Sequence, residues 1–100
     1  MDMESWNLAD FERAAEDGTA AFYLYTPLCG TCQVASRMLG VTEQLLPDLS
    51  IGKADLNYHE EIAVKYGVES VPCLLIAREG EPVEKVYAFR SVPYLYEKLG

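Results

Sequence analysis

Cys29 and Cys32 are the two residues whose type and spacing point most directly to chemistry. They stand three positions apart, with Gly30 and Thr31 between them. Two thiols at this spacing can form and break a disulfide, can supply half of a metal site, or can be two thiols without a chemical role. The elements that hold the pair help to decide between these three interpretations.

The pair is expected at the start of a helix that follows a buried strand. Residues 20–25, AAFYLY, are an apolar run too short for a helix and typical of a central strand with parallel neighbours. Further along, apolar residues recur at spacings of four, three and four, which predicts a helix over 30–46. These residues are Val34, Met38, Val41 and Leu45.

A helix start favours ionisation of a thiol, because the first turn has unpaired N–H groups and a partial positive charge. A thiol with a pKa of about 8.5 is roughly 3% ionised at pH 7, whereas one near 7 is half ionised, a gap of about 2 kcal/mol. The helix dipole supplies about 0.3–1 kcal/mol of this, and up to ~2 in favourable geometry. Cys29, at the helix mouth, can therefore attack, and Cys32, one turn inside, can resolve the mixed disulfide.

Two alternatives remain beside dithiol chemistry. A structural zinc ion needs four ligands, and the chain offers Cys29, Cys32, Cys73 and its one histidine, His59, without a second close pair. We therefore expect no metal. The other alternative is a pair of non-catalytic thiols in a helix. Dithiol–disulfide redox chemistry is the favoured interpretation.

Composition narrows the class of protein. The 100 residues indicate one domain, 1–100. The chain has three cysteines, and an odd number argues against a disulfide framework. A net charge of −8 disfavours nucleic acid and anionic membranes as partners. Neither a secretory signal nor a membrane helix is found in the sequence, so a cytoplasmic location is expected. Disulfides are transient there, which favours redox chemistry for a Cys-x-x-Cys pair.

The remaining elements complete an α/β pattern. Helices are expected over 8–17, 58–66 and 92–99, capped by Asn7, Asn57 and Ser91, and strands over 49–56, 72–77 and 83–89, with a hairpin turn at Glu79-Gly80. Alternating strands and helices predict parallel pairing, and the hairpin adds an antiparallel edge. The predicted fold is a mixed four-stranded sheet flanked by helices on both faces.

Over nearly its whole length the chain resembles the thioredoxin family. The resemblance rests on "YTPLCGTC", on "KADLNYHEEIAVKYGVESVPCLLIA", and on "REGEPV" as the final hairpin. It implies the thioredoxin fold and a protein-disulfide oxidoreductase with Cys29 as nucleophile and Cys32 as resolving thiol. It also implies no bound cofactor, disulfide-containing protein substrates, and a thioredoxin reductase as a candidate electron donor.

The resemblance assigns further residues to the site. It implies a cis Val71-Pro72 bond in a loop packed against the cysteines, where Pro72 shields the sulfurs and the Val71 backbone pairs with an extended substrate. Gly30 and Thr31 would set the local geometry and tune the redox potential. Lys53 also matches a family position. Its charge would lower the pKa of a nearby thiol, or it is a solvated or salt-bridged lysine.

Cys73 directly follows Pro72 and is expected near the pair. It is either a small buried apolar group or a third redox participant, in which case the chain would be a redox sensor. A further alternative is a non-catalytic module that holds a peptide beside Pro72.

The chain departs from the usual family pattern around the pair. Leu28 replaces a Trp before the first cysteine, and Thr31 replaces a Pro between the cysteines. Tyr23 stands where many members have a buried Asp, and a phenol with a pKa near 10 is a poor base at neutral pH. Two more departures are Arg37 for a helix-kinking Pro and Ala88 for a groove Gly.

Overall fold

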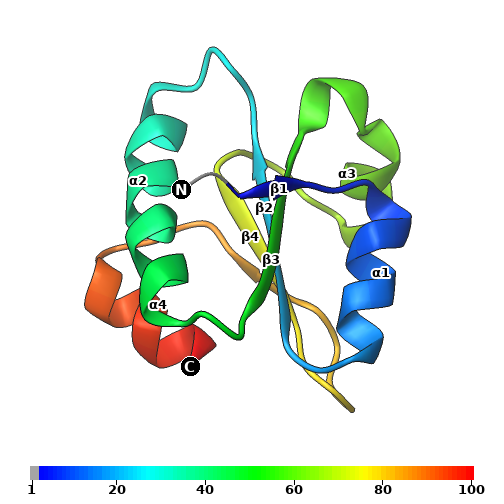
Figure 1. The fold of residues 1–100 in the computed structure, drawn as a ribbon. Helices are drawn as coiled ribbons and strands as arrows, with labels where there is room; N and C mark the ends of the chain where they lie inside the picture. Colours follow the sequence, from blue (N-terminus) through cyan, green and yellow to red (C-terminus); the bar gives the residue numbers. More distant parts are fainter. Residues whose placement is uncertain (1–2) are drawn as a thin grey trace.

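The computed structural model describes residues 3–100, which form a five-stranded sheet between two layers of helices (Figure 1). The spatial order of the strands is β1-β3-β2-β4-β5. Their bounds are β1 Glu4–Ser5, β2 Ala20–Tyr25, β3 Ser50–Asp55, β4 Cys73–Ala77 and β5 Glu84–Val86. The predicted α/β fold, a mixed sheet flanked by helices on both faces, is confirmed, but the predicted count of four strands is wrong.

The missed strand is β1, at one edge of the sheet. It has only two residues, Glu4 and Ser5, which pair in parallel with Gly52 and Lys53 of β3. Two residues carry no detectable period in a sequence, so pairing with β3 and not local propensity defines this strand.

The central strand β2 has one parallel and one antiparallel neighbour. It pairs in parallel with β3 and antiparallel with β4, and β5 adds the antiparallel edge that the sequence predicts. The expectation of parallel neighbours on both sides of β2 was wrong. Between β3 and β4 the chain passes through a short 3₁₀ turn and a seven-residue helix, and it enters β4 antiparallel to β2.

The helices cover the two faces in pairs (Figure 1). Helices α2 and α4 lie on one face, and α1 and α3 lie on the other. Their bounds are α1 Leu8–Glu16, α2 Gly30–Leu45, α3 Glu60–Tyr66 and α4 Val92–Leu99. Asn7 and Ser91 cap α1 and α4 through their side chains, as predicted. The predicted helix over 58–66 is present as α3 but begins two residues later, at Glu60. Asn57, its predicted cap, lies instead in a 3₁₀ turn, Leu56–Tyr58, which Asp55 caps.

Strand β2 supplies both hydrophobic cores because its side chains alternate between faces. Ala21 and Tyr23 join the cluster with residues of α2 and α4, whereas Phe22 and Leu24 join the cluster with residues of α1 and α3. These residues of β2 are fully buried. The strand is therefore fixed from both sides, and its carboxyl end is a rigid place from which to start α2.

Helix α2 exists as predicted but buries a different side. Its buried residues are Cys32, Ala35, Leu39 and Thr42. The large apolar residues that predict the helix, Val34, Val41 and Leu45, are about half exposed. The side of α2 that faces the sheet is thus the one that carries Cys32.

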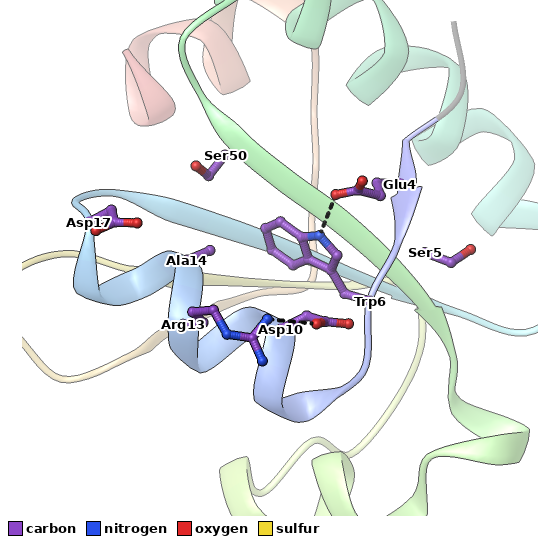
Figure 2. Close-up of a pocket in the computed structure, with 8 residues that line it drawn as sticks. All are labelled: Glu4, Ser5, Trp6, Asp10, Arg13, Ala14, Asp17 and Ser50. Carbon is purple, nitrogen blue, oxygen red and sulfur yellow. Dashed lines mark hydrogen bonds and ion pairs between the residues drawn. The ribbon is translucent and has the colours of Figure 1, made fainter.

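At the edge of the sheet formed by β1, Trp6 covers Gly52 of the neighbouring strand β3. A side chain on Gly52 would overlap the indole, so only glycine leaves room for this contact. The indole N–H donates to Glu4 at 3.0 Å, and Arg13 pairs with Asp10 nearby (Figure 2). These residues line a polar hollow of about 490 Å³ that contains no cysteine.

Candidate active site

Cys29 and Cys32 form a disulfide at the amino end of α2. Their Cα atoms are 5.2 Å apart. Cys29 is the N-cap residue and is partly exposed, whereas Cys32 lies in the first turn and is only 3% exposed. The order expected from the spacing, with one sulfur outside and one behind it, is therefore present.

The outer sulfur receives hydrogen bonds from its own helix. The backbone N–H of Cys32 donates to Sγ of Cys29 at 3.2 Å, and Oγ1 of Thr31 lies 3.4 Å from the same sulfur. Both groups can stabilise negative charge on this atom when the disulfide is opened. Residue types and position thus suit a nucleophilic thiolate at Cys29.

Behind the pair, Tyr23 reaches from β2 to the first turn of α2. Its hydroxyl donates to the backbone carbonyl of Cys32 at 2.6 Å and accepts from the hydroxyl of Ser36 at 3.1 Å. Burial raises the pKa of Tyr23 above its ordinary value, so the phenol stays neutral.

A groove of about 380 Å³ runs beside the disulfide. Its lining comes from α2, from the loop at Pro72 and from the segment after β5: Thr31, Val34, Ala35, Met38, Pro72, Tyr87 and Phe89. The Val71-Pro72 bond is cis, as the resemblance implies. The Tyr87 hydroxyl accepts from the backbone N–H of Glu69 at 3.2 Å and so ties this side of the groove to the Pro72 loop.

The residues around Cys29 present an open, apolar surface. Leu28 is 99% exposed, directly before Cys29. Gly30 and Thr31 are also exposed. An incoming chain can therefore reach the outer sulfur without displacing packed atoms, and it would meet an aliphatic side chain as it does so.

Cys73 and Lys53, two further residues assigned to the site, have neighbours of their own in the structure. Cys73 is fully buried in the cluster beneath α1 and α3, the face opposite α2. Burial raises the pKa of its thiol to about 11, so this thiol stays protonated at neutral pH. The Lys53 ammonium lies over the ring of Tyr25, 6.0 Å from its centroid.

The four candidate zinc ligands are not assembled. Cys73 lies on the other face of the sheet from α2, and Nδ1 of His59 lies 3.4 Å from Glu61. Among residues 3–100, no three His, Cys, Asp or Glu side chains are arranged to hold a metal ion.

Over the same residues, no helix has the length and hydropathy to cross a bilayer.

Comparison with known proteins gives the family. The Thioredoxin family model matches residues 3–99. The chain belongs to the thioredoxin family. It is 51% identical over 84 residues to the thioredoxin-like protein YusE of Bacillus subtilis, which covers 84% of this chain and 79% of YusE. It is 34% identical over 88 residues to thioredoxin of the same organism, covering 87% and 85% of the two chains.

Solved structures agree on the fold. Chloroplastic thioredoxin z superposes with a TM-score of 0.85 over 99% of this chain and 92% of that one, at 17% identity. Family membership and the Cys29–Cys32 pair together support thiol–disulfide oxidoreductase activity in general terms.

Sequence reasoning missed several residues of this site. Tyr23 is noticed only as a departure, and Ser36 is not noticed, although it stands one helical turn after Cys32. Tyr87, which the sequence analysis does not single out, also lines the groove. The alternation of β2 could have placed Tyr23 on the α2 face; nothing in the sequence signals the Tyr87 contact.

Proposed function

We propose that this chain, acting as a single domain over residues 1–100, reduces or exchanges protein or small-molecule disulfides through the Cys29/Cys32 couple. One observation carries the proposal. The partly exposed sulfur of Cys29 caps α2 and accepts the N–H of Cys32, while the second sulfur lies directly behind it.

The reduced chain would act in two exchange steps. The Cys29 thiolate attacks one sulfur of a substrate disulfide, which forms a Cys29–substrate bond and releases the other substrate sulfur as a thiolate. Cys32, after losing its proton to water, attacks Sγ of Cys29, which forms the Cys29–Cys32 disulfide and releases the second substrate thiolate. Both thiolates take protons from water. The substrate gains two electrons, and the chain loses two.

The groove beside Pro72 supports an extended protein segment as the substrate. Its lining is mostly apolar, and it begins at Thr31, between the two cysteines. We propose that the Val71 backbone pairs with such a segment by strand addition while Pro72 screens the sulfurs. Leu28, exposed before Cys29, would contact the same segment.

The oxidised couple must be reduced again before a second turnover. We propose that an external dithiol system of the thioredoxin reductase type supplies the two electrons. A reducing compartment such as the cytoplasm maintains systems of this kind. On this proposal the chain needs no bound cofactor, because both electrons travel in the two sulfurs.

The proposal is tested by turnover of a disulfide-containing protein with dithiothreitol as the electron donor. We expect the chain to accelerate reduction above the rate with dithiothreitol alone, and Cys29→Ser to abolish the acceleration. Cys73→Ser is the control and should keep the rate. A chain that binds such substrates but never accelerates their reduction is a peptide-binding module, and the proposal is then wrong.

A further inference from the structure

We propose that Tyr23 is a positioning residue for the dithiol: its hydroxyl, held by Ser36, fixes the first turn of α2 and keeps Cys32 aligned with Cys29. The inference rests on the proposed function, because it concerns how fast and how completely this couple forms its disulfide. Its basis is a chain of two hydrogen bonds, from Ser36 to Tyr23 at 3.1 Å and from Tyr23 to the Cys32 carbonyl at 2.6 Å.

The phenol ring is placed by packing. It is fully buried, stacks on Tyr25 with ring centroids 5.6 Å apart, and meets Phe89 edge-on at 5.9 Å. A phenylalanine ring could make the same contacts without a hydroxyl that must find a partner. Packing alone therefore does not account for the hydroxyl at this position.

The Cys32 carbonyl does not need the phenol as a partner. Inside an α-helix that carbonyl accepts the N–H of the residue four positions later, here Ser36. The bond from Tyr23 is thus an additional bond that joins the central strand to the first helical turn. With two donors on one carbonyl, the peptide unit that follows Cys32 has little freedom to tilt.

Alignment of Cys32 controls the second exchange step. In that step the Cys32 thiolate attacks Sγ of Cys29 and the Cys29–substrate bond breaks, with the electron pair leaving on the substrate sulfur. An intramolecular attack is faster and more favourable when the nucleophile is held in the correct position. Loosening the first turn lowers the effective concentration of Cys32 near Cys29. The equilibrium constant for disulfide formation and the rate of substrate release should then both fall.

The test is Tyr23→Phe, with Tyr25→Phe as the matched control. Both changes remove one phenol oxygen from β2, and among residues 3–100 the Tyr25 hydroxyl has no hydrogen-bond partner. The equilibrium constant of the Cys29–Cys32 disulfide is measured against glutathione, and release of a Cys29-linked substrate is timed by quenched flow.

For Tyr23→Phe we expect a three- to tenfold lower equilibrium constant for disulfide formation and a similar drop in the release rate. A tenfold drop corresponds to a potential about 30 mV less negative. In Tyr23→Phe the rate of the first attack by Cys29 should stay within 1.5-fold of that of the unmodified chain. In Tyr25→Phe the equilibrium constant and the release rate should stay within the same limit. Ser36→Ala should give a smaller change in the same direction and serves if Tyr23→Phe does not fold.

The outcomes separate the two levels of inference. If Tyr23→Phe loses thermal stability but keeps its equilibrium constant and release rate, Tyr23 only packs and the inference is overturned. If Tyr23→Phe does not fold and Ser36→Ala leaves both quantities unchanged, the inference is overturned as well. If the unmodified chain exchanges no disulfide, the proposed function fails instead, and this inference falls with it.

Discussion

The backbone N–H of Cys32 points at Sγ of Cys29 across 3.2 Å, so the residue that caps α2 is also the outer half of the disulfide. We expect the same N–H to donate to this sulfur when the disulfide is reduced and the sulfur becomes a thiolate. The atom that caps the helix is thus also the proposed nucleophile.

The first prediction concerns ionisation of the reduced pair. Because the helix end favours negative charge on the outer sulfur, the pH dependence of Cys29 alkylation should have a midpoint below the ~8.5 of a free cysteine. Iodoacetamide labelling followed by peptide mapping measures it. Cys73, buried on the other face, should stay unlabelled in the folded chain. A Cys29 midpoint at or above 8.5 would contradict the prediction.

The second prediction separates the roles of the two sulfurs. In Cys32→Ser the resolving thiol is gone, so a substrate disulfide should leave the substrate attached to Cys29. Non-reducing electrophoresis and mass spectrometry should show a stable 1:1 adduct that dithiothreitol releases. In Cys29→Ser the two remaining thiols, Cys32 and Cys73, are 3% and 0% exposed, and no adduct should form. An adduct on Cys32 would reverse the assignment.

The third prediction concerns Leu28 and substrate choice. If this exposed side chain is covered by a protein substrate, Leu28→Ala should lower kcat/KM for protein disulfides about three- to tenfold, equivalent to roughly 1 kcal/mol of lost burial. Oxidised glutathione is too small to cover it and should react unchanged. Val64→Ala removes an exposed apolar side chain from α3 and is the control. Equal losses for both substrates would argue against a binding role.

The fourth prediction concerns the close contact at the sheet edge. Gly52→Ala places a methyl group inside the Trp6 indole and should cost about 1–3 kcal/mol in the free energy of unfolding. Gly40→Ala has open space around the new methyl group and lies inside α2, so it should stabilise by up to ~1 kcal/mol. Urea unfolding measures both. Similar stability for the two variants would mean that Trp6 can move aside.

The fifth prediction concerns the pH dependence of stability. Burial raises the pKa of Cys73 to about 11, so above roughly pH 8.5 the unfolded chain releases this proton and the folded chain keeps it. The unfolded state then binds fewer protons, and stability falls as pH rises from about 8.5 to 11, by about 3 kcal/mol at most. The oxidised chain should show this fall in urea unfolding. Cys73→Ala should lack that part of the slope.

Much of the fold can be predicted from local sequence patterns, because those patterns reflect burial and hydrogen bonding between nearby residues. The apolar run 20–25 must be buried on both faces, and the caps Asn7 and Ser91 mark their helices because their side chains bind backbone N–H groups. The position of the cysteine pair after that run follows from the same signals. These features depend on neighbours in the sequence and so can be predicted from it.

What could not be predicted depends on distant contacts. Both sides of α2 repeat with a helical period, so periodicity alone does not choose between Val34 and Ala35 as the buried side. The direction of β4 cannot be predicted from its residues, because a fully apolar strand has the same pattern in either direction. The bond from Tyr23 to Cys32 joins two elements, and only their packing reveals it.

The central claim is that Cys29 and Cys32 form a reversible, reactive dithiol couple. Equilibrating the chain in glutathione redox buffers and mapping the disulfide by mass spectrometry tests it most directly. We predict one intramolecular Cys29–Cys32 bond with a potential between about −270 and −120 mV, the span of thioredoxin-type catalysts. A pair that stays reduced under these oxidising conditions, or that pairs with Cys73 instead, would contradict it.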